Sequence, residues 1–458
     1  MRVEIIFVYI ALLCLPLNVV LAADYYVDKN HGSASDSNDG TSESLPWLTI
    51  NKAATTLTAG DTVYVKDGEY NEAVVISNSG SVGSPITFKN YPGHSPVIDG
   101  TDVVISSNYA LIYANSKDYI IIDGFEFRDS DENCLNMWRC DEFIIRNNLI
   151  HSNDVNGRDC VLAGYSEGGL IENNEVYDCG GNAINISSTT DVVVKSNYIH
   201  DNPNHTGVNI FPVTTDSQVD FSGNNVFYNK ITGCTSGIYS RHQTNNIIAF
   251  NLIYDNDVSN ASGIYFHHTD GDETTTTANT KVYNNTIVNN DNYGIEVEQH
   301  HNLDIKNNII YGSTVAMSFE SGSTTGHTID YNLYTASSNF RWGSGDNINF
   351  ATWKTNSSQD ANSSEDDPLF NSNYYITNGS PAINNGDNQY SDGDGNQFDL
   401  GGFLVWDDDV DAVSGYWVDG VDMGAYAYIA NVIISGSNKV SGGGTGTLLN
   451  GTGTITGQ

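Results

Sequence analysis

The chain has 458 residues, of which 56 are acidic and 18 are basic, giving a formal charge of −38 at pH 7. A surface with this excess of negative charge repels nucleic acids and anionic membranes, so we expect neither as a partner. No stretch beyond residue 23 is apolar for long enough to span a bilayer.

The first 23 residues read as a secretory signal. Arg2 supplies a positive charge, an apolar run follows, and Val20-Leu21-Ala22 offers a small-residue cleavage site. We therefore expect the mature protein, from residue 24, to be secreted or displayed at the cell surface.

The segment after the signal predicts a cap for a β-structure. A strand leads into a loop rich in Gly, Ser, Asn and Asp, and a short amphipathic helix follows near residues 48–57. An open first repeat would expose its core and its strand edges, so we expect this helix to cover it, with Trp47 and Ile50 packed beneath. Further strands are predicted at residues 85–88, 96–100 and 119–127.

From residue 134 to residue 333 one short sequence pattern recurs. A strand that opens with a small residue is followed by a polar turn, a second apolar strand, an Asn-rich turn and a third strand. The strand openings are residues 134–138, 160–164, 183–187, 207–211, 237–241, 263–267, 294–298 and 316–320. The Asn markers are Asn148, Asn174, Asn197, Asn225, Asn251, Asn285, Asn308 and Asn332. A period in the low to middle twenties predicts a solenoid whose units stack into one core.

These repeats resemble the right-handed parallel β-helix of the pectate-lyase type. Asn at a fixed place suits that fold, because a sharp turn favours a residue that tolerates left-handed backbone angles, and its side chain can bond to the equivalent Asn one turn away. The resemblance implies an all-β parallel β-helix over residues 24–333, with an amino-terminal helical cap and a small carboxy-terminal β module.

The carboxy-terminal part departs from the repeat. Ser380-Pro381-Ala382-Ile383 and residues 421–426 resemble the closing module of secreted bacterial β-helix proteins, which implies a module over residues 334–430 associated with surface display. Residues 431–458 read as a Gly/Ser/Thr-rich linker or the start of a further module. A Gly-rich loop at residues 391–402 predicts either a Ca²⁺ site or a plain acidic turn. Its candidate ligands are Asp392, Asp394, Asn396 and Asp399.

The cysteines after the signal are odd in number and widely spaced. Cys134 and Cys160 hold the same place in consecutive repeats, where they could stack or bridge. We favour buried, unpaired small residues over a disulfide framework.

Alternation along the strand openings predicts a polar row on the outer face. If the second and fourth positions face the core, the third and fifth point outward, and neighbouring turns lie about 4.8 Å apart. The fifth positions then bring Arg241, His267, Glu298 and Glu320 into one row, beside Tyr239, Tyr265 and Glu296. His267 also stands directly before the longest insertion, which contributes His268.

This row has side chains suited to cleaving a polysaccharide by β-elimination. A lyase must neutralise a uronate carboxylate, remove the proton at C5 and protonate the leaving oxygen, and Arg241, His267 and Tyr265 suit these steps in that order. We predict that Glu298 is a catalytic residue together with these three. The predicted substrate contacts are Tyr239, Glu296, Glu320 and His268. The β-helix lyases that the repeats resemble commonly use Lys or Arg as base with Ca²⁺ held nearby, and in this row only Arg241 matches them in kind.

Two other interpretations stay open. A glycoside hydrolase would use two carboxylates across the glycosidic bond, and Glu296, Glu298 and Glu320 are available. A non-catalytic surface protein would bind glycan or act as a stalk, with the row consisting of ordinary cross-strand charge pairs. In each case we expect a monomer and a polysaccharide partner.

Overall fold

The computed structural model of the chain describes residues 22–383 and 385–387, apart from residues 106–109, 154–156, 213–220, 242–243, 257–260, 268–278, 299–300 and 344. It also describes strands β37 (Val432–Ile434) and β38 (Gly453–Ile455), which pair antiparallel. The signal up to residue 21, His268 and the predicted Ca²⁺ loop lie outside the described residues.

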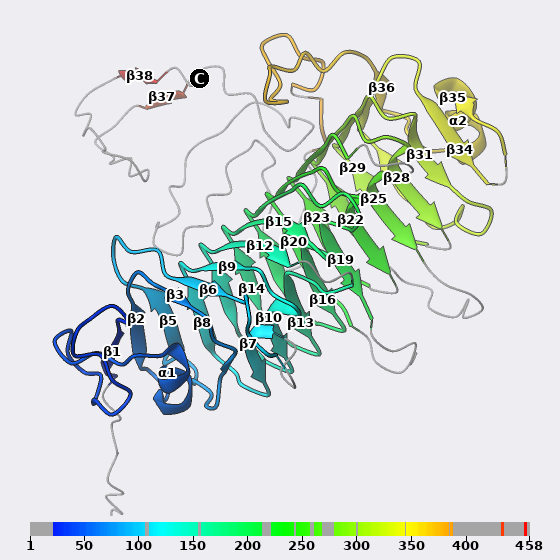
Figure 1. Cartoon of the computed structure of the whole chain (residues 1–458). Coiled ribbons are helices and arrows are strands. Elements are labelled where there is room, and N and C mark those ends of the chain that lie inside the picture. Colours follow the sequence, from blue (N-terminus) through cyan, green and yellow to red (C-terminus); the bar gives the residue numbers. More distant parts are fainter. Residues whose placement is uncertain are drawn as a thin grey trace, which may run out of the picture.

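The described chain winds into a parallel β-helix with three long faces, which we call sheets A, B and C (Figure 1). Each turn contributes one short strand to each sheet, and each sheet has twelve strands among the described residues. The pairing is parallel throughout the solenoid except between the last two strands of sheet C. The predicted all-β solenoid is confirmed.

The strands of the three sheets have the following bounds. Sheet A contains β1 (Asp24–Val27), β2 (Thr62–Val65), β5 (Ile86–Asn90), β8 (Ile120–Asp123), β11 (Ile144–Arg146), β14 (Leu170–Glu172), β17 (Val193–Lys195), β20 (Asn225–Phe227), β23 (Ile247–Ala249), β26 (Lys281–Tyr283), β29 (Asp304–Lys306) and β32 (Thr328–Asp330). Sheet B contains β3 (Glu69–Tyr70), β6 (Val97–Asp99), β9 (Glu126–Arg128), β12 (Leu149–Asn153), β15 (Glu175–Cys179), β18 (Tyr198–His200), β21 (Lys230–Thr232), β24 (Leu252–Tyr254), β27 (Thr286–Val288), β30 (Ile309–Tyr311), β33 (Leu333–Tyr334) and β36 (Ser364–Glu365). Sheet C contains β4 (Val74–Val75), β7 (Ala110–Asn115), β10 (Asn133–Trp138), β13 (Val161–Gly164), β16 (Ile184–Ser187), β19 (Val208–Phe211), β22 (Ser236–Arg241), β25 (Ser262–His267), β28 (Tyr293–Glu298), β31 (Val315–Phe319), β34 (Asn339–Trp342) and β35 (Ile348–Asn349).

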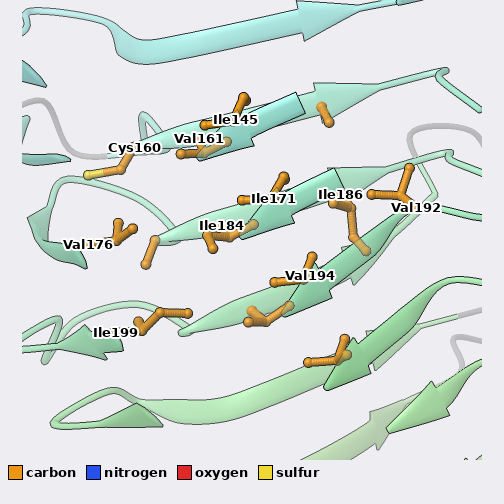
Figure 2. Packing of buried hydrophobic residues seen from close by; sticks show 14 of the residues in the cluster. Ile145, Cys160, Val161, Ile171, Val176, Ile184, Ile186, Val192, Val194 and Ile199 are labelled. Atoms are coloured by element: carbon orange, nitrogen blue, oxygen red, sulfur yellow. The ribbon is translucent and has the colours of Figure 1, made fainter. Parts of the chain in front are cut away.

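The core is a set of aliphatic columns that run along the solenoid. Ile145, Ile171 and Val194 are paired in register on consecutive strands of sheet A, and all three are fully buried. Figure 2 shows these side chains one above another, facing those of the other sheets. No single turn can bury its apolar face alone, so this stacking holds the turns together.

Asparagine side chains form a buried ladder at the corner between sheets A and B. In each step the side-chain amide of one Asn donates to the side-chain oxygen of the next, as Asn148 does to Asn174 at 3.0 Å. The same oxygen also accepts from the backbone N–H of the preceding Asn, again at 3.0 Å. The members are Asn148, Asn174, Asn197, Asn229, Asn251, Asn285, Asn308 and Asn332.

The predicted marker Asn225 is wrong, because the ladder passes through Asn229. Asn225 begins β20 on sheet A and is partly exposed, whereas Asn229 is buried between β20 and β21. At this corner the residue with a left-handed backbone conformation is the one before the ladder Asn. Asn147 has φ 57° and Tyr228 has φ 55° at equivalent places. The ladder position is therefore selected for its hydrogen bonds and not for a left-handed backbone.

A short helix covers the first turn, as predicted. Helix α1 (Ile50–Thr56) is capped by Thr49, whose hydroxyl accepts from the N–H of Lys52 at 3.1 Å. The carboxylate of Glu72 accepts from the N–H groups of Ile50 and Asn51, at 3.1 and 2.9 Å. Trp47 and Ile50 are buried, which confirms their packing role.

The last turn is closed by a second helix, α2 (Phe350–Ser357), which follows β35. Its Trp353 is buried and donates from Nε1 to Asp360 Oδ2 at 2.5 Å. Asp360 also accepts from Tyr334 and Ser363 and lies wholly inside the protein, so burial raises its pKa. Neither α1 nor α2 is long and apolar enough to cross a membrane.

The chain after β36 turns back onto the outer surface of sheet B. Ile376 and Ala382 pack against Ile309 and Leu333 of strands β30 and β33. Ala382 belongs to the motif that resembles a closing module, and this packing places it against the side of the solenoid. Sheets B and C reach beyond residue 333, to β36 and β35. The predicted domain division and the display role stay predictions.

The prediction of unpaired cysteines is correct for three of them and wrong for two. Cys134, Cys140 and Cys234 are free and buried. Cys160 and Cys179 form a disulfide, with their Cα atoms 5.6 Å apart. The two cysteines lie at the corner between sheets B and C. Cys179 ends β15 of sheet B, and Cys160 stands directly before β13 of sheet C. Sequence spacing alone does not reveal that approach.

Candidate active site

The outer face of sheet C brings the predicted row together. Arg241 of β22 is in register with His267 of β25, and His267 is in register with Glu298 of β28. Two residues earlier on the same strands, Tyr239, Tyr265 and Glu296 form a parallel column. In these strands the intervening residues are buried and the row residues are partly exposed, so the predicted alternation holds.

Two hydrogen bonds and one ion-pair contact join four of these side chains into a series. The hydroxyl of Tyr239 lies 3.0 Å from Nδ1 of His267. Nε2 of His267 lies 3.4 Å from Oε2 of Glu298, and the hydroxyl of Tyr265 donates to the same oxygen at 2.5 Å. The carboxylate favours a proton on Nε2, which leaves the lone pair of Nδ1 directed at Tyr239.

Both tyrosines are held as neutral phenols. Burial, and then the hydrogen bond and charge of Glu298, raise the pKa of Tyr265. Burial also raises the pKa of Tyr239, while the guanidinium of Arg241 acts in the opposite direction. The two hydroxyls differ in direction, since one is bonded to the imidazole and the other to the carboxylate. Tyr239 and Tyr265 therefore have different chemical surroundings in spite of their equivalent places.

Glu296 is a carboxyl group that is partly neutral at physiological pH. Burial raises its pKa to about 7, and the charges of Glu298 and Glu320 act in the same direction. The hydroxyl of Ser262, which donates to Oε2 at 2.7 Å, and the charge of Arg341 oppose the rise. A carboxylic acid with this pKa can give up a proton near neutrality, which ordinary surface glutamates cannot do.

Two arginines flank the site, Arg241 in the row and Arg341 at the end of the parallel column that contains Glu296. The guanidinium of Arg241 lies 4.8 Å from the ring centre of Phe211 on the preceding strand. Arg341 of β34 is in register with Ser318 and donates to the hydroxyl of Tyr293. Between these cations burial raises the pKa of Glu320, and the neighbouring Glu298 raises it further.

Sheet A shows ordinary cross-strand charge pairs, and their arrangement differs from that of the row on sheet C. There opposite charges alternate along one column: Asp123 bonds Lys89 and Arg146, both at 3.1 Å, and Lys195 bonds Glu172 at 3.2 Å. The row on sheet C instead places like charges next to one another, which destabilises a sheet. A cluster that costs stability in this way is typical of a functional site.

The structure gathers seven predicted site residues on one face. They are Tyr239, Arg241, Tyr265, His267, Glu296, Glu298 and Glu320. His268 and the predicted Ca²⁺ ligands Asp392, Asp394, Asn396 and Asp399 lie outside the described residues. Within the described part of the chain, no group of three or more His, Cys, Asp or Glu side chains is arranged to hold a metal ion.

Sequence reasoning missed Ser262 and Arg341. Ser262 precedes the strand opening by one residue, where the repeat pattern gave no reason to look. Arg341 lies beyond the predicted end of the array at residue 333, although residues 339–342 continue the same alternation. Extending the pattern by one turn would have found Arg341.

Comparisons with known proteins support the fold. A family model described as "Pel9A-like, right handed beta helix region" matches residues 25–191. A second, described as "Right handed beta helix region", matches residues 228–333. The predicted right-handed parallel β-helix is thereby confirmed.

Two curated proteins match parts of the chain. The uncharacterized protein YwoF of Bacillus subtilis (strain 168) is 38% identical over 111 residues, which is 24% of this chain and 23% of that protein. Pectate lyase PEL9 of Emericella nidulans is 36% identical over 86 residues, which is 18% of this chain and 20% of that protein. These matches span about a fifth of the relatives' length. The solved structure of pectate lyase Pel9A overlaps 90% of this chain and 97% of its own, with a TM-score of 0.53 and 14% identity, which shows a shared fold.

Proposed function

We propose that this right-handed parallel β-helix protein is a polysaccharide lyase whose active site is the outer face of sheet C, and that it cleaves a uronate-containing glycan by β-elimination. The observation that carries the proposal is the series in which Tyr239 hydrogen-bonds to His267 and His267 faces the carboxylate of Glu298, beside Glu296, a carboxyl group with a pKa of about 7. The match to pectate lyase PEL9 supports the choice of an acidic glycan.

The base of the reaction is His267, acting through Tyr239. Glu298 holds the imidazole with its proton on Nε2, so Nδ1 can take the phenolic proton of Tyr239 as the phenolic oxygen takes the C5 proton of the sugar. The three side chains have the roles of a catalytic triad, in which an acidic group orients an imidazole that activates a hydroxyl. Tyr265 keeps Glu298 in place by donating to it.

Arg241 is assigned to the uronate carboxylate. Neutralising that carboxylate makes the neighbouring C5–H more acidic, because the charge that develops on removal of the proton spreads onto the carboxylate. The electron pair of the C5–H bond forms the C4–C5 double bond, and the bond from C4 to the glycosidic oxygen breaks. Arg241 lies one strand from His267, which places the carboxylate beside the base.

The leaving oxygen takes its proton from Glu296. The neutral fraction of this group is large near pH 7, and it lies in the column beside Glu298. The hydroxyl of Tyr265 is engaged by Glu298, so Glu296 is the better proton donor in this geometry. The proton balance closes, since one proton moves from C5 to the base and another moves from Glu296 to the departing sugar.

A glycoside hydrolase is the second candidate, and one observation favours it. Glu296 and Glu298 are two carboxyl groups on one strand, and the pKa of Glu296 is raised first by burial and then by its acidic neighbours. A neutral acid beside a carboxylate is the pair that hydrolysis of a glycosidic bond requires.

The products of the reaction separate the two candidates. The purified protein is incubated with polygalacturonate, alginate and xylan, and both reducing ends and far-ultraviolet absorbance are followed. A lyase produces an unsaturated, absorbing sugar for each new reducing end, while a hydrolase produces reducing ends alone. Absence of both signals on all three polymers contradicts the enzyme proposal and favours a glycan-binding surface protein.

Three further expectations accompany this proposal. We propose that the protein is exported, that it acts as a monomer, and that the loop containing Asp392, Asp394, Asn396 and Asp399 binds Ca²⁺ in a structural role. The proposed proton transfers require side chains alone. Calorimetric titration with Ca²⁺ and light scattering of the purified protein test the last two, and no heat of binding would remove the Ca²⁺ site.

A further inference from the structure

We propose that Trp138 forms a remote sugar-binding subsite for a polysaccharide chain that lies along the outer face of sheet C. The inference rests on the proposed function and deepens it, since it fixes the direction of the substrate and the length that the protein recognises. The ligand class is a linear glycan, whose pyranose rings carry apolar C–H faces that pack on aromatic rings.

The ring of Trp138 forms the outer surface of its part of the sheet. Trp138 of β10 is in register with Gly164 of β13, and a side chain at residue 164 would overlap the six-membered ring. The indole ring of Trp138 therefore occupies the space that a side chain at residue 164 of β13 would fill. Gly164 is buried while Trp138 remains partly exposed, so the indole covers the glycine and itself meets solvent.

The indole is held in this position by neighbouring rings. Tyr165 meets it edge-on, with ring centres 4.9 Å apart and planes at 73°. The ring centres of Phe221 and Tyr165 are 6.2 Å apart, and the guanidinium of Arg139 lies 5.6 Å from the same tyrosine ring. A ring that is already fixed loses little conformational entropy when a ligand packs on it.

Trp138 stands in line with the candidate active site. It belongs to the same register column as Arg241 and His267, five strand-to-strand steps from His267, or about 24 Å. One pyranose residue lengthens a glycan by about the height of one turn, so a chain of about five or six sugars joins the two places. In the neighbouring column, two residues earlier on the same strands, the partly exposed Asn185 accepts from the buried Asn209 at 3.1 Å.

Aromatic side chains on another face of the solenoid are arranged differently. On sheet B, Tyr177 is stacked between His151 and His200, with ring centres 4.7 and 4.8 Å apart. Both faces of Tyr177 are therefore covered by protein rings. Trp138 has no stacked ring partner among the described residues, so a face of its indole remains for a sugar. Tyr177 is accordingly a matched control.

The test compares Trp138→Ala with Trp138→Phe and with the control Tyr177→Ala. Binding is measured by native electrophoresis in gels that contain polygalacturonate, alginate or xylan, which requires no turnover. For the polymer that retards the wild type, we expect Trp138→Ala to raise the dissociation constant about tenfold, equivalent to about 1.4 kcal/mol. Trp138→Phe should recover part of the affinity, and Tyr177→Ala should bind as the wild type does.

A second measurement uses substrate length. Where the wild type degrades the polymer, Trp138→Ala should raise KM for oligomers of eight sugars and leave kcat and KM for trimers unchanged, because trimers at the active site do not reach Trp138. Unchanged binding and unchanged KM for the octamer overturn the subsite, with circular dichroism verifying that each variant is folded.

Failure of the subsite and failure of the proposed function give different results. Wild-type protein that binds a polymer through Trp138 but degrades none refutes the lyase and keeps the subsite. Degradation that is independent of Trp138 keeps the lyase and refutes the subsite. Absence of retardation by all three polymers overturns the subsite as proposed.

Discussion

Glu296→Gln is expected to make the protein more stable and less active at the same time. The pKa of Glu296 rises from 4.5 to about 7 on folding, so the folded protein holds this proton more tightly than the unfolded chain. Between pH 4.5 and about 7 the folded state therefore binds more protons, and stability falls as the pH rises through this window. Above pH 7 the full cost of the buried charge is present.

The size of the effect follows from the same values. A pKa that lies about 2.5 higher in the folded state corresponds to an upper bound of about 3 kcal/mol, since each pKa unit is about 1.4 kcal/mol. Glu296 retains some contact with solvent, which screens the charge and reduces the expected figure to about 2 kcal/mol. Gln keeps an oxygen that can accept from Ser262, so the mutation removes the charge with little other loss.

The assay is urea unfolding of the wild type and Glu296→Gln at pH 4 and pH 8. We expect equal stability at pH 4 and a gain of about 2 kcal/mol for the variant at pH 8, together with a loss of kcat on the active polymer. The control is Glu172→Gln on sheet A, where Lys195 pairs with the carboxylate at 3.2 Å, so that no stabilisation is expected at pH 8. A variant no more stable than the wild type at pH 8 would refute the reasoning.

The remaining predictions concern catalysis, the Asn ladder and the carboxy-terminal closure. His267→Ala should lower kcat by about 10²- to 10⁴-fold with an unchanged melting temperature, whereas His200→Ala on sheet B should keep full activity; a loss of only a few-fold removes His267 from the mechanism. Asn229→Ala should cost about 2–4 kcal/mol in chemical denaturation, because it removes four buried hydrogen bonds and takes away the acceptor of the Asn197 backbone N–H. Asn225→Ala should cost less than about 0.5 kcal/mol, and equal effects at the two positions contradict the corrected ladder. Asp360→Ala should cost about 3–5 kcal/mol, since it leaves three buried donors without an acceptor, and a smaller loss in the same assay rules out this role in closing the solenoid.

The parts of the fold that depend on period were predictable from the sequence. A side-chain period of two and a repeat of fixed register determine which residues share a column, so Arg241, His267 and Glu298 could be placed side by side without a structure. The same reasoning does not give the hydrogen bonds within the row. Whether Tyr239 or Tyr265 contacts the imidazole depends on side-chain rotamers, which the repeat does not determine.

The incorrect predictions have identifiable physical causes. Asn225 resembles a ladder member because an Asn-Asn pair marks several other turns, yet in this turn the second Asn of the pair begins β20 and the ladder is formed by Asn229. Cys160 and Cys179 meet at a corner whose geometry appears only when the chain is folded. The pKa of Glu296 was not predictable either, because burial is its largest cause and burial is a property of the packed site.

The asparagine ladder also has an electrical direction. In every step from Asn148 to Asn332 the amide donates one N–H to the next Asn, toward the carboxy-terminal end, and the other to a backbone carbonyl of the preceding turn, so the amides repeat one orientation along the column. The positive end of this column meets Asp360, since Nδ2 of Asn332 lies 3.4 Å from Oδ1 of that buried carboxyl group. Burial raises the pKa of Asp360, and the hydrogen bond from Asn332 at the end of the column opposes part of that rise. A solenoid lengthened by whole turns would preserve this polarity, whereas a turn lacking the ladder Asn would divide the column into two shorter dipoles.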